Sequence, residues 1–151
     1  MFGLTKKLRE IYRSIFGLKM PFVQQFNANG CGAAALEMVY RYYGIRRTSQ
    51  AEIFNKYKKQ NPVSLNDFYI QTDDLIADAK QNGFNNARWE RIDISDKDLV
   101  VHTLLEFIKK RVPIIACQQF TKELPHIGHF RVVVRIWRDN IYFHDPHLKY
   151  G

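Results

Sequence analysis

Residues 29–44 read NGCGAAALEMVYRYYG, a cysteine between two glycines followed by a run of good helix formers. Because Ala, Leu, Glu and Met have high helix propensities, a helix is predicted to begin close to Cys31. Gly44 is a natural end for it. One apolar stripe at helical spacing can be buried, and it consists of Leu36, Val39, Tyr40 and Tyr43. The stretch therefore predicts a core helix with a cysteine at its start.

Cys31 has two interpretations. Backbone N–H groups and the helix dipole stabilise negative charge at a helix N-terminus. Such a position, or a nearby imidazolium, can lower a Cys pKa from about 8.5 to between roughly 3.5 and 7.5. The glycines on either side let a substrate backbone approach closely. A lone cysteine before an Ala-rich helix is, however, more often a small buried hydrophobe. The choice depends on which other residues accompany it.

Gln25 lies six residues before Cys31. Acyl transfer needs a donor aimed at the oxyanion of the tetrahedral intermediate, and a Gln amide can act beside the N–H of the nucleophile. Gln24 is adjacent, so the sequence alone does not choose between the two. A surface Gln without a role is the common alternative.

His129 stands at the start of a predicted strand over residues 130–137, and Asp145 closes the next one. A His at the mouth of a strand is held firmly yet exposed, which suits a general base that later acts as an acid. A carboxylate against its outer ring nitrogen would fix the imidazole tautomer. The two are sixteen positions apart, so they would face each other in a hairpin centred on Trp137. The turn that the sequence shows is centred about two residues later. Bringing them together thus requires a bulge or a longer loop.

The other histidines suit lesser roles. His102 is expected on a helix face, and solvated or supporting positions are expected for His126, His144 and His147.

The rest of the chain predicts an α+β fold, with helices first and antiparallel strands second. Thr48 or Ser49 is the expected N-cap of a helix through Lys56, with Glu52 near the capping-box position. A loop is predicted for residues 61–70. Further helices are predicted over 72–81 and 98–110, and strands over 112–117, 130–137 and 141–144. In the second strand, Arg131 and Arg135 are predicted on one face, and Val132, Val134 and Ile136 on the other.

The net charge of +8 is concentrated near the N-terminus, where five Lys/Arg and one Glu in residues 1–20 leave +4. Residues 2–18 predict a basic amphipathic helix, which either lies on an anionic membrane surface or packs on its own domain. The remaining basic residues form small separate groups outside any nucleic-acid motif, which excludes a nucleic-acid partner. Two cysteines 86 positions apart predict neither a disulfide framework nor a metal site, and a reduced, cytoplasmic protein without cofactors is expected.

Three ordered motifs resemble the C39 peptidases, papain-like domains that remove double-glycine leader peptides. They are Gln25 with Cys31-Gly32 and the helix after it, the stretch from His129 to Val134, and Asp145-Pro146. The resemblance covers roughly residues 22–146. It implies a papain-like fold in which N-terminal helices pack on a C-terminal sheet. This domain is expected to occupy residues 21–151 and to follow the helical segment 1–20. The resemblance also implies that Cys31 is the nucleophile, His129 the base, Asp145 the orienting acid and Gln25 the oxyanion donor.

Two features depart from the family. Gly30 stands where the family usually has Asp before the cysteine. The local loop and the substrate pocket are therefore where this chain is expected to depart from the family. The family's processing peptidases are usually fused to an ABC exporter, and this chain shows neither membrane spans nor a P-loop, so a stand-alone relative or an excised domain is expected.

The function that the resemblance implies is hydrolysis of leader peptides after a Gly-Gly pair, possible partners being an ABC transporter or a membrane surface at the inner face of the membrane. A papain-like acyl transferase would use the same residues. A non-catalytic peptide-binding or docking domain is the alternative of a different class.

Overall fold

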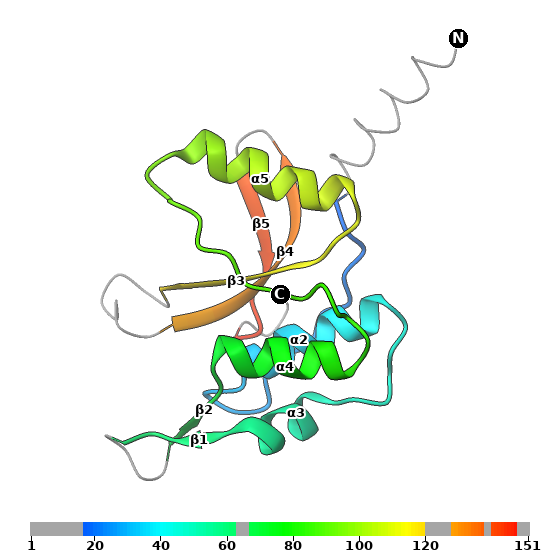
Figure 1. The fold of residues 1–151 in the computed structure, drawn as a ribbon, viewed down its shortest axis with the longest axis vertical. Coiled ribbons are helices and arrows are strands. Elements are labelled where there is room, and N and C mark those ends of the chain that lie inside the picture. The colour runs from blue at the N-terminus through cyan, green and yellow to red at the C-terminus, as the bar shows by residue number, and fades with distance from the viewer. Residues whose placement is uncertain (1–16, 63–66, 120–127, 138–139, 148–151) are drawn as a thin grey trace.

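The computed structural model describes residues 17–62, 67–119, 128–137 and 140–147. Helices come first along the chain and the larger sheet comes last, which confirms the predicted α+β arrangement (Figure 1). The helices are α2 Cys31–Tyr42, α3 Gln50–Tyr57, α4 Thr72–Gln81 and α5 Lys97–Lys109. The strands are β1 Lys59–Gln60, β2 Phe68–Tyr69, β3 Ile114–Gln119, β4 Gly128–Trp137 and β5 Asn140–His144.

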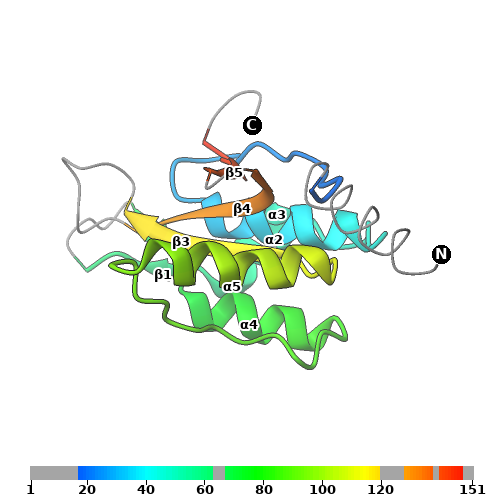
Figure 2. The ribbon, with the colours of Figure 1, turned by 90° about the horizontal axis from the view of Figure 1, so that it is seen from above.

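The larger sheet has the strand order β3-β4-β5, and both pairs of neighbours are antiparallel. The central strand β4 contacts both α2 and α5, which Figure 1 and Figure 2 show on separate sides of the domain. Val132 and Val133 follow one another on β4 and are both fully buried. Because successive strand residues point to opposite faces, both faces of β4 are covered at this point.

β4 departs from the predicted alternation at one residue. Its register against β5 shifts between Val133 and Arg135, so Val134 is an extra residue on this strand. A bulge of this kind reverses the alternation beyond it. The prediction that Arg131 and Arg135 share a face is therefore wrong, and Val134, predicted on the buried face, is only partly buried.

Small residues let α2 approach its neighbours closely. Ala33, Ala34 and Ala35 are completely buried. A Cβ on Gly32 would lie 3.1 Å from the ring of Phe130 and 3.3 Å from the side chain of Leu75. The glycine after the cysteine therefore serves the contact between α2, α4 and β4.

A buried carboxylate joins three of the helices. Asp78 of α4, only 2% exposed, accepts a hydrogen bond from the Tyr40 hydroxyl of α2 over 2.5 Å. Lys56 of α3 donates to the other carboxylate oxygen over 3.1 Å, and Asn82 adds a further donor at 3.1 Å. Moving one helix away would leave the buried carboxylate without a partner, which is energetically costly. The network therefore favours one arrangement of the three helices.

The helix limits agree with the predictions to within a few residues. Ser49 and Glu52 form the predicted capping box of α3. The prediction of a loop over 61–70 is wrong for Phe68–Tyr69, which pair with Lys59–Gln60. Strands of two residues are too short to produce a period in the sequence.

The chain enters the domain through residues 17–20. Gly17 has φ +57°, and a Cβ there would lie 2.2 Å from the carbonyl oxygen of Val134, so only glycine fits. Leu18 donates its N–H to the same oxygen over 2.7 Å, and Leu18 and Met20 are buried. The core thus includes residues before the predicted domain start at 21. Gly17 and Leu18 are not helical, which corrects the end of the predicted 2–18 helix, and the rest of that helix lies outside the described residues.

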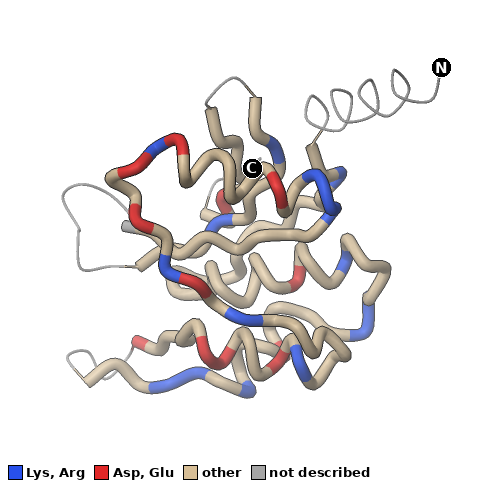
Figure 3. The backbone as a smooth tube through the Cα atoms, turned by 45° about the horizontal axis from the view of Figure 1, so that its top comes forward, with Lys and Arg blue, Asp and Glu red and all other residues tan. Residues whose placement is uncertain are grey.

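Figure 3 shows Lys and Arg interspersed with Asp and Glu over the described chain. Among the helices that the structure describes, none has the length and apolar character needed to cross a membrane.

Candidate active site

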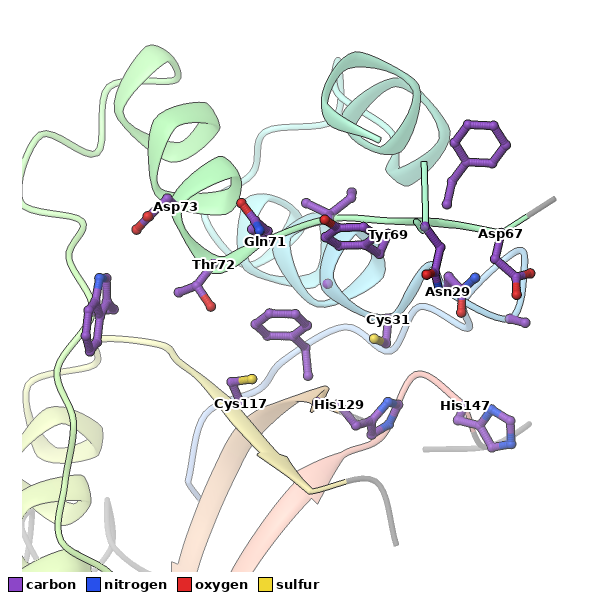
Figure 4. Close-up of a pocket in the computed structure, with 18 of the residues that line it drawn as sticks. Asn29, Cys31, Asp67, Tyr69, Gln71, Thr72, Asp73, Cys117, His129 and His147 are labelled. Carbon is purple, nitrogen blue, oxygen red and sulfur yellow. The ribbon is translucent and has the colours of Figure 1, made fainter. Parts of the chain in front are cut away.

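An open cleft with a volume of about 1010 Å³ lies beside the N-terminus of α2. Figure 4 shows Cys31, His129 and Cys117 gathered around it, from α2, β4 and β3 respectively. Its far side is formed by β2 and the start of α4. The other lining residues include Asn29, Asp67, Tyr69, Gln71, Thr72, Asp73, Trp89, Arg91 and His147. The cleft therefore contains two of the four predicted site residues, Cys31 and His129.

Cys31 is the first residue of α2, and Gly30 before it provides no side-chain cap. Burial raises the pKa of the Cys31 thiol, although backbone N–H groups of Phe130 and Gly32 act in the opposite direction. The sequence left open whether the helix N-terminus lowers the pKa of Cys31 or the residue is a small buried hydrophobe. In this structure the loss of solvent outweighs the backbone donors. The thiol needs a base to become a nucleophile.

His129 is such a base, but it is only 4% exposed, so the prediction of an exposed histidine is wrong. Its Nε2–H donates to Oδ1 of Asp145 over 2.6 Å. Burial lowers the pKa of His129, and Asp145 opposes this effect while Arg131 and His147 add to it. The imidazole is therefore neutral at pH 7. With Nε2 engaged by Asp145, Nδ1 is the ring nitrogen through which a proton would be taken up.

The bulge in β4 removes part of the mismatch in spacing between His129 and Asp145. Trp137 pairs with Asn140 near the turn, whereas beyond the bulge Val132 pairs with His144. One extra residue on β4 thus moves Asp145, which follows β5, toward the start of β4. The sequence left open whether a bulge or a longer loop brings the two residues together, and the structure has a bulge at Val134.

Asp145 has three donors on its two carboxylate oxygens. Oδ1 accepts from His129 and, over 3.0 Å, from the backbone N–H of His147, while Oδ2 accepts from Nε of Arg131 over 2.7 Å. Burial alone would raise the pKa of Asp145, but these hydrogen bonds outweigh it and lower the pKa. Asp145 is therefore a charged carboxylate held in one orientation.

Sequence reasoning missed Arg131, although a signal was available. Arg131 lies two residues after His129 on a strand, so both side chains reach the same face. The prediction treated Arg131 only as part of a polar face with Arg135.

Gln25 is not brought to the cleft in this structure. Its Nε2 donates to the carbonyl oxygens of Asn27 over 2.8 Å and Ala28 over 3.0 Å, so both amide hydrogens bind the loop before Cys31. Its Oε1 is buried without a hydrogen-bond partner among the described residues. Gln24, the other candidate, is exposed. The donors that do adjoin the thiol are the backbone N–H groups of Phe130 on β4 and of Gly32 and Cys31 at the start of α2.

The remaining histidines differ in position. His147 lines the cleft, with its ring centroid 6.3 Å from that of His129. His144 packs edge-on against Phe22, and His102 is exposed on α5. His126 lies outside the described residues. Within the described chain, no three His, Cys, Asp or Glu side chains are placed to hold a metal ion.

Comparison with known proteins agrees with these features of the chain. No curated protein sequence matches it. The sequence model of one family, described as the Peptidase_C39 like family, matches residues 17–150. The match begins at the glycine where the chain enters the core, and it spans the cleft and all of the larger sheet. It confirms the expected papain-like α+β fold, and the chain belongs to the Peptidase_C39 like family.

Proposed function

We propose that the protein is a cysteine peptidase in which Cys31 is the nucleophile, His129 the general base and acid, and Asp145 the orienting carboxylate. The observation that carries this proposal is the 2.6 Å hydrogen bond between His129 and Asp145, next to the cleft that Cys31 and His129 line. A base oriented by a third group, beside a thiol at a helix N-terminus, is the arrangement that nucleophilic catalysis needs.

The proposed reaction begins when Nδ1 of His129 takes the proton of the Cys31 thiol. The thiolate sulfur attacks the carbonyl carbon of the peptide bond, and backbone N–H groups at the start of α2 stabilise the oxyanion. The intermediate collapses as His129 returns the proton to the leaving amine. Water activated by His129 then hydrolyses the thioester, which restores the thiol and releases the acid.

The proposed substrates are leader peptides cleaved after a Gly-Gly pair. This proposal rests on the family resemblance of the cysteine, histidine and aspartate motifs. A reduced compartment such as the cytoplasm would keep the thiol reactive. An ABC transporter or a membrane surface is the proposed partner.

One observation favours a second candidate, a peptide-binding domain without catalysis. Burial raises the pKa of Cys31, so the thiol is not already ionised at neutral pH. Such a domain would bind leader peptides in the same cleft and leave them intact. A papain-like acyl transferase would form the same thioester and transfer it to an amine or a thiol.

The test is incubation of the protein with a panel of double-glycine peptides, with products followed by mass spectrometry. Cys31→Ala is expected to abolish cleavage. Cys117→Ala is the matched control, because Cys117 lines the same cleft and has no role in the proposed mechanism. It is expected to retain activity. Added amines or thiols would capture the acyl group from a transferase.

Binding of the peptides without cleavage by the native chain would favour the docking domain. Alkylation of Cys31 no faster than that of Cys117 would add to that conclusion, since a base-assisted thiol should react faster.

A further inference from the structure

We propose that Arg131 is a positioning residue of the active site, which holds Asp145 so that its second oxygen orients His129. The inference rests on the proposed function and adds a fourth member to Cys31, His129 and Asp145. Arg131 would act through the carboxylate and not on the substrate.

The geometry around Asp145 carries the proposal. Nε of Arg131 and Nε2 of His129 bind different oxygens of one carboxylate, over 2.7 Å and 2.6 Å. The backbone N–H of His147 adds a third contact at 3.0 Å. A carboxylate held on both oxygens cannot rotate about its Cβ–Cγ bond without losing a charge-assisted hydrogen bond. The direction of the His129 ring is thereby determined.

Burial distinguishes this ion pair from the others. The side chains of Arg131 and Asp145 are 15% and 13% exposed. In the other Lys or Arg ion pairs among the described residues, the basic side chain is at least 34% exposed. Removing two charges from water is costly, and a buried ion pair is weak evidence for a role in stability. Its placement two residues from the candidate base argues for a role in orienting that base.

Arg131 also affects the protonation of the base. Its positive charge lowers the pKa of His129, after burial as the main cause, and its hydrogen bond lowers the pKa of Asp145. His147, after β5, also lowers the pKa of His129. The other titratable groups that line the cleft are Cys31, Asp67, Tyr69, Asp73, Arg91 and Cys117. Loss of the guanidinium should therefore raise the pKa of His129.

The experiment compares Arg131→Gln, which keeps a donor but removes the charge, with Arg131→Lys, which keeps the charge but not the planar fork. Lys109→Gln, which removes the partly exposed pair with Glu106, is the matched control. The pKa of His129 is measured by NMR titration of its ring, which needs no substrate. For the cleaved peptide, kcat and KM are measured separately against pH.

Arg131→Gln is expected to raise the pKa of His129 and to move the acidic limb of kcat to higher pH. Arg131→Lys is expected to keep that pKa near the native value. In both variants kcat is expected to fall by up to about 100-fold while KM stays nearly unchanged. A fall of this size is what a displacement of a catalytic group by about 1 Å causes. A merely structural arginine would lower kcat without moving the pH profile.

A folded Arg131→Gln with the native His129 pKa and native kcat would overturn the proposal. If that variant does not fold, Arg131→Lys decides, because a native kcat in it would overturn the need for a planar donor. An upward pKa shift in a protein that cleaves no peptide would overturn only the proposed function, and it would support the coupling of Arg131 to His129.

Discussion

The backbone N–H of Gln25 donates a hydrogen bond to the carbonyl oxygen of Pro146 over 2.9 Å. This bond joins the loop before Cys31 to the residue after Asp145. The Gln25 side chain braces the same loop through Asn27 and Ala28. In this structure Gln25 thus supports the two segments that bear the nucleophile and the carboxylate.

Gln25→Ala tests that role. The variant loses two loop hydrogen bonds, and we expect the free energy of unfolding to fall by about 1–2 kcal/mol. Thermal and urea unfolding measure this change, and Gln24→Ala, at an exposed position, is the control. Loss of an oxyanion donor would instead lower kcat by about 10²–10³ with little change in stability. That second result would return Gln25 to the role predicted from the sequence.

Gly32→Ala is expected to destabilise the fold. The added Cβ would lie 3.1 Å from the Phe130 ring and 3.3 Å from Leu75, both inside the core. Overpacking of this kind costs about 1–3 kcal/mol, which exceeds the roughly 0.5–1 kcal/mol that Ala gains over Gly within a helix. Urea denaturation measures the cost, with Gly128→Ala as the control, because a Cβ there meets only the Cys117 sulfur at 3.4 Å. Equal stability of the two variants would contradict the close packing of α2 on β4.

Asp78→Ala should be the more damaging change in the buried network. It leaves the Tyr40 hydroxyl and the Lys56 ammonium without their carboxylate, and we expect a loss of about 3 kcal/mol or more. Tyr40→Phe keeps the other two donors on Asp78 and should cost only about 1 kcal/mol. Asp93→Ala, at an exposed carboxylate, serves as the control for a lost charge. A Tyr40→Phe variant as unstable as Asp78→Ala would contradict this order.

Stability should fall as the pH is lowered, in two steps. Burial lowers the pKa of His129 below its ordinary 6.5, so below pH 6.5 the unfolded chain binds a proton that the folded protein does not. The free energy of unfolding therefore decreases from about pH 6.5 down to the folded pKa. Asp145, with a pKa below its ordinary 3.8, causes a second loss as the pH falls below that value.

Urea unfolding at a series of pH values measures both steps. His129→Gln is expected to flatten the first step in part, and His144→Gln to flatten it further, since burial also lowers the pKa of His144. A first step of unchanged size in the double variant would contradict the assignment to these two histidines.

Much of this fold could be predicted from local patterns. The helix from Cys31 to Tyr42, the capping box at Ser49 and the helix over 72–81 depend on propensity and on contacts within four residues. These signals come from residues close together in the sequence, so the sequence alone reveals them. The β1–β2 pair was missed because two-residue strands have no period and depend on their partner.

The sequence by itself determined the order of the site, with a cysteine at the start of a helix, a histidine opening one strand and an aspartate closing the next. It also determined that a hairpin whose turn is centred about two residues after Trp137 needs a bulge or a longer loop to bring His129 and Asp145 together. Only the tertiary structure decided where that bulge lies, that burial raises the pKa of Cys31, that the Gln25 amide binds its own loop, and that Arg131 shares Asp145 with His129. The reason is physical: residue order sets which groups a segment carries, whereas burial, register and hydrogen-bond partners are set by segments distant in sequence.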